Sequence, residues 1–246
     1  MRSIQIKMTS RGRPRNFDRP AALRQAMQVF WALGYEGATL NHLQEAMGGI
    51  APPSFYAAFG SKEALFREAV ELYSRTLGLP MMKALAEGTT ARASIEALLQ
   101  AAIESFCKPG LPRGCFLVFG GINNVPVNQT VQDYVRGLRL RRQKAIQRRL
   151  RRAVDEGELP KKLDPVALAA FYTTVIDGLA IQARDGVSRK ALNFAACCAM
   201  AAWDPVVHGT KQPRMDTNET ANGHELTRNK RGRGKTEPQM DADLRR

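Results

Sequence analysis

The chain has 246 residues, 44% of them hydrophobic, and a formal net charge of +14 at pH 7. This length allows one small and one larger folded unit, or a single domain with a tail, around a sizeable core. The positive charge favours a polyanionic partner, with nucleic acid ahead of an anionic membrane surface. Four cysteines without a CxxC pair and three histidines lack zinc-ligand spacing, so we expect no metal and no cofactor.

Residues 1–16 are basic and lack the apolar region of a secretion signal. They cannot bury apolar area, so we expect a flexible arm. It is either a solvated tail or a segment that binds the DNA backbone or minor groove. No stretch of the chain approaches the roughly 20 apolar residues of a membrane span. We therefore expect a cytoplasmic protein with reduced thiols and no membrane partner.

Apolar residues at three- and four-residue spacing predict a first helix from Asp18, its N-cap, to about Leu33. Gly34 and Gly37 are expected to stop this helix, because glycine adopts backbone angles that other residues avoid. Thr39 can then cap a second short helix.

The second helix is followed by Gly48-Gly49, which permits the positive backbone angles of a sharp turn. Pro52-Pro53 fit the first turn of a third helix, where a missing N–H costs nothing. Ser61 opens a fourth helix, which Gly78-Leu79-Pro80 is expected to end. Residues 39–62 therefore predict a helix-turn-helix, a unit that places one small helix in the major groove of DNA.

The pattern after this unit stays helical, and we expect helices over 91–107, 129–156, 165–183 and 188–203. The apolar run 115–119 is too short to classify by period; its helical neighbours favour a buried helix, and a strand is the alternative. No alternating apolar pattern is long enough to build a sheet, so we expect an all-α chain. Residues 205–246 are polar, and we expect a disordered basic tail.

An enzyme has little support in the sequence. No Ser/His/Asp set, motif-bound carboxylate pair, phosphate-binding Walker loop or dinucleotide fingerprint is present. His42 falls in the predicted helix-turn-helix, while His208 and His224 fall in the expected tail. We therefore do not expect catalytic residues.

Residues 17–66 resemble the N-terminal domain of TetR/AcrR-family transcriptional regulators. The resemblance is strongest over Ser54–Leu65, which reads Ser-Phe-Tyr-Ala-Ala-Phe-Gly-Ser-Lys-Glu-Ala-Leu. It implies an N-terminal helix-turn-helix domain over 17–79 and a helical effector-binding and dimerisation domain over 80–204. One departure from the family pattern is the extra glycine in the 47–50 turn, which either widens the turn or tilts the recognition helix.

The resemblance also makes residues 52–58 the recognition helix. Pro52, Pro53 and Ser54 would then face bases or adjacent phosphates from its N-terminus. The Tyr56 hydroxyl would contact a phosphate, and Lys62 and Thr39 would bind the DNA backbone. Hydroxyls, ammonium groups and helix N-termini are the usual phosphate ligands, which set the register while groove contacts specify sequence.

The last two predicted helices carry wide apolar faces with small residues, and the resemblance implies that they form a homodimer as a four-helix bundle. A two-fold dimer places two recognition helices about one DNA turn apart and so predicts a palindromic operator. The residues expected on these faces are Ala167, Leu168, Phe171, Val175, Leu179, Ala191, Phe194, Ala195, Cys198 and Ala202.

An effector pocket in this domain should be a mostly apolar cavity with a few polar anchors. Its candidate residues, for which plain core packing is the alternative, are Phe106, Cys107, Cys115, Phe116, Phe119 and Tyr134. Cys115 follows Arg113-Gly114, and a nearby positive charge or helix N-terminus could lower the pKa of its thiol. It is either a sensor of the kind some family members use or an inert buried thiol.

Residues 136–152 carry nine basic side chains without one acid. The default interpretation is a solvated face; contact with DNA flanks or with a partner's acidic surface are alternatives. The leading hypothesis for the whole chain is a dimeric, ligand-responsive repressor that binds double-stranded DNA and an unknown small effector. The alternative is a sequence-nonspecific or architectural nucleic-acid-binding protein that uses the basic helix and tails.

Overall fold

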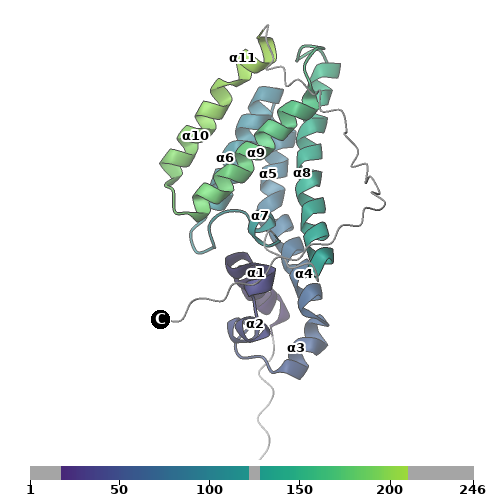
Figure 1. Cartoon of the computed structure of the whole chain (residues 1–246), viewed down its shortest axis with the longest axis vertical. Coiled ribbons are helices and arrows are strands. Elements are labelled where there is room, and N and C mark those ends of the chain that lie inside the picture. Colours follow the sequence, from purple (N-terminus) through teal and green to yellow (C-terminus); the bar gives the residue numbers. More distant parts are fainter. Residues whose placement is uncertain (1–17, 122–127, 210–246) are drawn as a thin grey trace, which may run out of the picture. The chain divides into compact units, whose positions relative to one another are not determined.

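The computed structural model describes residues 18–121 and 128–209, and within these ranges every regular element is a helix (Figure 1). The all-α prediction is therefore confirmed. The basic arm expected at 1–16 and residues 210–246 of the expected tail lie outside the described residues.

Four helices open the described chain: α1 (Arg19–Gly37), α2 (Leu40–Ala46), α3 (Pro52–Phe59) and α4 (Lys62–Tyr73). Each predicted N-cap is confirmed by a side-chain hydrogen bond. The Asp18 carboxylate accepts from the Ala21 N–H, the Thr39 hydroxyl from the His42 N–H, and the Ser61 hydroxyl from the Ala64 N–H. These local bonds satisfy N–H groups that have no partner within the helix.

Helix α1 is interrupted at Gly34, whose φ of 73° and ψ of 173° are not helical. The prediction that the helix stops near Leu33 matches this break, although helical residues resume and reach Gly37. The carbonyls exposed by the break find distant donors, because Arg184 donates to the oxygens of Trp31 and Ala32. The Tyr35 N–H donates to the Gly120 carbonyl on the other side of the break.

The prediction that Gly78-Leu79-Pro80 ends the fourth helix is wrong. Helix α4 continues through a π-helical turn, η1 (Ser74–Gly78), into α5 (Leu79–Glu87), which crosses the expected domain boundary at 79. Pro80 lies in the first turn of α5, directly after the π-helical turn, and has no N–H to donate to it. In addition, the Ser74 and Thr76 hydroxyls donate to the carbonyls of Val70 and Leu72 in the preceding turn.

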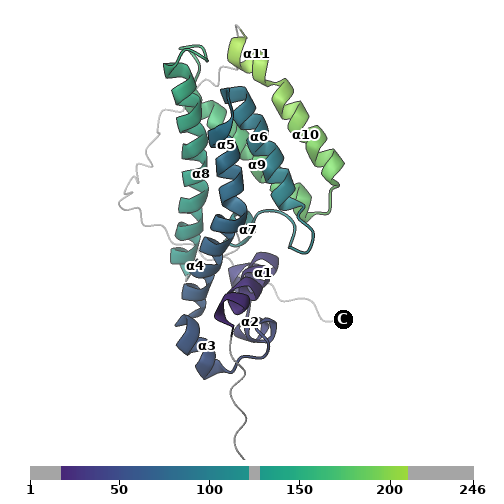
Figure 2. The ribbon, with the colours of Figure 1, turned by 180° about the vertical axis from the view of Figure 1, so that it is seen from behind.

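The remaining elements are α6 (Ala91–Phe106), α7 (Phe116–Phe119), α8 (Gln129–Asp155), α9 (Pro165–Arg184), α10 (Arg189–Ala201) and α11 (Trp203–His208). The short α7 confirms the helical interpretation of the apolar run. Helix α6 contacts α5, α9 and α10, and α8 packs along α9; α10 and α8 lie at opposite edges of this layer (Figures 1 and 2). The folded region also extends past the expected boundary at 204, because Val207 of α11 is buried.

An aromatic cluster joins the first helices to the rest of the core. The Trp31 ring of α1 lies 5.0 Å from Tyr73 of α4 and 6.4 Å from Phe116 of α7. Phe66 meets Phe116 edge to face at 5.6 Å. Such pairs add to the stabilisation from burial alone, so α1, α4 and α7 are held as one packed unit.

Helix α9 is long and apolar enough to cross a membrane by length and composition, with a mean hydropathy of 1.5 over its best window. The expectation that no stretch approaches that composition is therefore wrong. A core helix of a water-soluble protein passes the same test, and α9 packs against α6, α8 and α10. Its remaining apolar residues, such as Phe171 and Ile181, face outward.

Candidate nucleic-acid interface and cavity

Helix α3 separates core side chains from exposed ones. Phe55 and Phe59 are buried, as expected for residues that pin the helix to the core. Tyr56 lies on the outer face with 48% of its surface exposed. The predicted contacts Pro52, Pro53 and Ser54 are exposed at the N-terminal end, where no side-chain hydrogen bond caps the described helix. Pro52 and Pro53 carry no N–H, and the Phe55 N–H donates to the Ala51 carbonyl, so this end offers a phosphate the N–H and hydroxyl of Ser54 only.

Thr39 and Lys62 lie at the N-terminal ends of α2 and α4, the two helices that flank α3 in sequence. Thr39 is exposed, and its hydroxyl accepts one N–H and keeps a hydrogen to donate. The Lys62 ammonium lies 4.5 Å from the centre of the Tyr35 ring, a cation–π contact that orients it. Partial burial lowers the pKa of Lys62, and nearby Glu36 opposes that change.

The extra glycine in the 47–50 turn is accommodated in a hydrogen-bonded turn. Gly48 and Gly49 have φ values of 87° and 78°, as expected of glycines. The N–H groups of Gly49 and Ile50 both donate to the Gln44 carbonyl. The turn is thus closed on α2 rather than loosened by the additional residue.

Arg19 of α1, which the sequence analysis did not single out, stabilises the position of α3. Its guanidinium pairs with Glu68 of α4 at 2.7 Å, donates to the Ala58 carbonyl of α3 at 3.1 Å, and stacks 4.7 Å from the Phe59 ring. An arginine can make such contacts together because its planar group offers several donors and an apolar face. One side chain therefore ties α1, α3 and α4 together.

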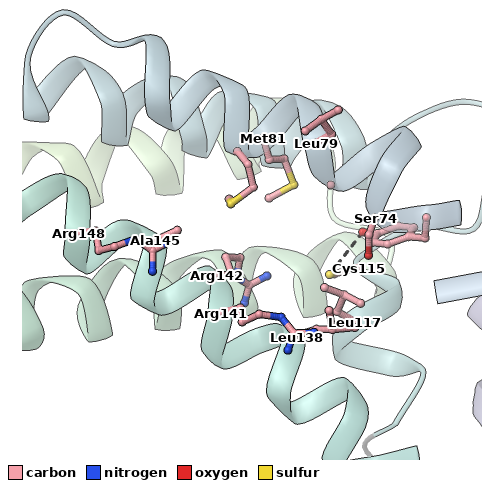
Figure 3. A pocket seen from close by; sticks show the side chains of 13 residues that line it. Ser74, Leu79, Met81, Cys115, Leu117, Leu138, Arg141, Arg142, Ala145 and Arg148 are labelled. Carbon is pink, nitrogen blue, oxygen red and sulfur yellow. Dashed lines mark hydrogen bonds between the residues drawn. The ribbon is translucent and has the colours of Figure 1, made fainter. Parts of the chain in front are cut away.

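A cavity of about 380 Å³ lies between the α4–η1–α5 segment and α8. Figure 3 shows its two walls, with Leu79 and Met81 facing Leu138, Arg141 and Arg142 of α8. Its volume is within the range of small-molecule sites. The lining is mainly apolar, and its polar groups are on Tyr73, Ser74, Cys115, Arg141, Arg142 and Arg148.

Of the six predicted pocket residues, only Cys115 lines this cavity. Phe106 and Phe116 are fully buried core residues, in keeping with the alternative given for them. Phe119 stacks against Arg184, and Tyr134 against Arg67. Cys107 lies beside the Arg113 guanidinium instead. An apolar run identifies buried residues, but which of them face a void depends on the opposite wall.

Cys115 lies at the end of the cavity as the buried N-cap residue of α7. The Tyr73 hydroxyl donates to its sulfur at 3.5 Å, the contact drawn as a dashed line in Figure 3. Burial, and then the neighbouring Cys115, raise the pKa of the Tyr73 hydroxyl well above its usual range. Tyr73 therefore stays protonated and available as a donor at neutral pH.

The expectation of a fully solvated basic face on 136–152 is wrong for two of its residues. Arg142 is buried and pairs with Asp177 of α9. Arg149 is also buried, donates to the Ser94 hydroxyl at 2.9 Å, and lies 3.5 Å from a Glu158 oxygen. Buried guanidinium groups require such partners, because an unpaired buried charge is costly. These two arginines therefore belong to the interior and cannot reach DNA.

An exposed helix held by a helix-turn-helix core, followed by a helical domain with a cavity, defines a DNA-binding transcriptional regulator. Residues 22–69 match the family model of bacterial regulatory proteins of the tetR family, and residues 91–197 match the tetracyclin repressor-like C-terminal domain. The chain is 32% identical over 206 residues to the HTH-type transcriptional repressor ComR of Escherichia coli strain K12, covering 83% of this chain and 98% of ComR.

Two further relatives agree. The HTH-type transcriptional repressor BdcR of the same organism is 28% identical over 203 residues, 78% of this chain and 89% of BdcR. A cysteine variant of the TetR family regulator CifR, solved with a 26-base-pair operator DNA, is 42% identical with a TM-score of 0.74; the match covers 78% of this chain and 100% of that one. The chain belongs to the TetR family of transcriptional regulators, which are DNA-binding proteins and not enzymes.

Proposed function

We propose that the protein represses transcription in the cytoplasm as a homodimer that places α3 of each protomer in successive major grooves of a palindromic operator. The observation that carries this proposal is the exposed outer face of α3, with Tyr56 outward and Phe55 and Phe59 anchored inward. The operator complex of the relative CifR supports it. On this proposal Tyr56, Lys62 and Thr39 hold phosphates, and Pro52, Pro53 and Ser54 meet the groove.

The homodimer would form through α9 and α10. Phe194 of α10 has 72% of its surface exposed, and Phe171, Val166 and Ile181 of α9 are exposed beside small residues. Large exposed apolar side chains on neighbouring helices are typical of an interface. Two residues of the predicted apolar faces, Leu168 and Leu179, do not belong to this surface, because they are buried within the protomer.

An effector bound in the cavity would release the DNA. The α4–η1 segment carries Lys62 at one end and lines the cavity with Tyr73, Ser74 and Gly78 at the other. A π-helical turn is a common element at functional sites, and it is a natural place for this segment to bend. A ligand that binds more tightly to one position of α4 shifts the population toward dimers in which the distance between the two α3 helices no longer fits two adjacent grooves.

The test replaces Tyr56 with Phe and, separately, Lys62 with Ala. Operator DNA is first obtained by selection from a random pool, and footprinting should show a short protected palindrome. Each change should weaken operator binding by about 10- to 100-fold in a gel-shift titration, because it removes a hydrogen bond to a charged phosphate. The circular dichroism spectrum should be unchanged.

Matched controls are Tyr134→Phe and Lys83→Ala, which make the same chemical changes on α8 and α5. Both should bind the operator as tightly as the unaltered protein. Unchanged affinity in both Tyr56→Phe and Lys62→Ala would refute the assignment of α3 and α4 to the DNA. Uniform protection of every sequence would instead support the nonspecific, architectural alternative.

A further inference from the structure

The charged side chains that line the cavity are all of one sign. Arg141, Arg142 and Arg148 contribute positive charge, and among the described lining residues there is no Asp, Glu or His. The Tyr73 and Ser74 hydroxyls already donate to the Cys115 sulfur and the Val70 carbonyl, so the arginines are the main hydrogen-bond donors left for a ligand. A site with these groups is built to receive an acceptor with negative charge.

Arg142 is the one of these three arginines that is held inside the protein. Only 6% of its side chain is exposed, and its Nη2 donates to the Asp177 carboxylate. Its Nε is buried and has no hydrogen-bond partner among the described residues. Because leaving a buried donor unpaired costs free energy, each such group in a native structure needs an explanation. A ligand oxygen within the cavity would supply the missing acceptor.

The rest of the cavity requires an apolar ligand body. Leu79, Met81 and Met82 form one wall, and Leu117, Leu138 and Ala145 contribute to the other. Methionine side chains adapt to ligands of different outline. At about 30 Å³ for each water-sized group, 380 Å³ holds roughly a dozen non-hydrogen atoms.

We propose that the effector is a small organic carboxylate with an apolar body, bound with its carboxylate at Arg142 and its body between α5 and α8. This inference rests on the proposed function, since it names the ligand class of the same cavity. Asp177 already balances the charge of Arg142, so the excess positive charge comes from the two exposed arginines at the rim, Arg141 and Arg148. These two charges attract an anion, and the apolar lining favours one with an apolar body over inorganic phosphate.

The test titrates the full-length protein with hexanoate, octanoate and 1-naphthoate, and with the neutral amide of each, by isothermal calorimetry. At least one carboxylate should bind at one site per chain, with its amide at least about tenfold weaker, as expected for the loss of a charge-assisted hydrogen bond. Arg142→Gln should weaken binding of that carboxylate by at least about tenfold. Arg151→Gln, the same change at an exposed position of α8 outside the cavity, should leave it unchanged.

Arg142→Gln leaves Asp177 without its partner, so circular dichroism checks its fold. If this variant unfolds, the double variant Arg141→Gln, Arg148→Gln at the exposed rim tests the proposal instead. It should lower the affinity for the carboxylate and reduce the dependence of that affinity on salt. Equal binding of acid and amide, full affinity in both the Arg142 and the rim variants, or no binding of any of the three carboxylates at about 1 mM would overturn the proposal.

The same preparation is tested for operator binding without ligand, which separates this inference from the proposed function. Absence of operator binding would refute the repressor proposal, while the calorimetric result would still decide the ligand class. Carboxylate binding that releases the operator supports both. Carboxylate binding that leaves the operator complex intact would show that the cavity does not control DNA binding.

Discussion

In the proposed homodimer, replacing Phe194 with Glu should separate the protomers into folded monomers and abolish tight operator binding. Phe194 is the most exposed large apolar residue of the described chain. A two-fold interface would bury one new carboxylate from each protomer, and each buried ion costs several kcal/mol. Because about 1.4 kcal/mol is a factor of ten, dimer affinity should fall by roughly 1000-fold or more.

Sedimentation velocity and a gel shift on the operator measure the two consequences, and the melting temperature checks that the monomer is folded. Leu140→Glu is the matched control, since Leu140 is an exposed apolar residue on α8 and not on α9 or α10. It should remain a dimer that binds the operator. A Phe194→Glu protein that sediments as a dimer would place the interface elsewhere.

Replacing Gly114 with Val should destabilise the fold by about 3–5 kcal/mol. A Cβ at this position would lie 2.6 Å from the Phe119 ring and 2.7 Å from the Ala180 carbonyl oxygen. Gly114 also has a φ of +85°, which a β-branched residue strongly disfavours. The melting temperature should drop by about 10 °C in a domain of this size.

Gly110→Val separates the two causes. Gly110 lies in the same loop with a φ of +76°, but nothing lies within 4 Å of its added Cβ. Its cost should be limited to the backbone strain, about 1–2 kcal/mol. Equal melting temperatures for the two variants would mean that the loop before α7 yields easily and that its packing against α9 contributes little.

Local sequence chemistry predicted the helical architecture well. The caps at Asp18, Thr39 and Ser61, the turn at Gly48-Gly49 and the prolines of α3 act within a few residues, so each can be recognised without knowing the fold. Phe55 and Phe59 are four residues apart and share the buried face of α3, while the outward role of Tyr56 was implied by the resemblance to TetR/AcrR-family regulators. The exposed side of α3 was therefore predictable.

The cavity and the partners of the two buried arginines of α8 were not predictable by these rules. Arg142 meets Asp177 from another helix, and Arg149 meets Ser94, which is 55 residues away. Helical spacing did carry a signal that was missed, because Arg142 is four residues before Ile146 and Arg149 is three residues after it, on the buried face of α8. The basic pattern did not reveal the partners of these two arginines. The continuation of the helix past Pro80 was missed for a similar reason: it depends on a π-helical turn and on two hydroxyls that bond back to the preceding turn.

Arg184 has a further consequence for how this protein could evolve. It belongs to the last turn of α9, yet its guanidinium donates to main-chain oxygens at the bend of α1 and to that of Arg113. If α9 forms the dimer interface, the hydrogen bonds of Arg184 transmit any change in the crossing angle of the helices at that interface to the tilt of α1. Substitutions at the interface could then alter the preferred half-site separation without touching a single base-reading residue.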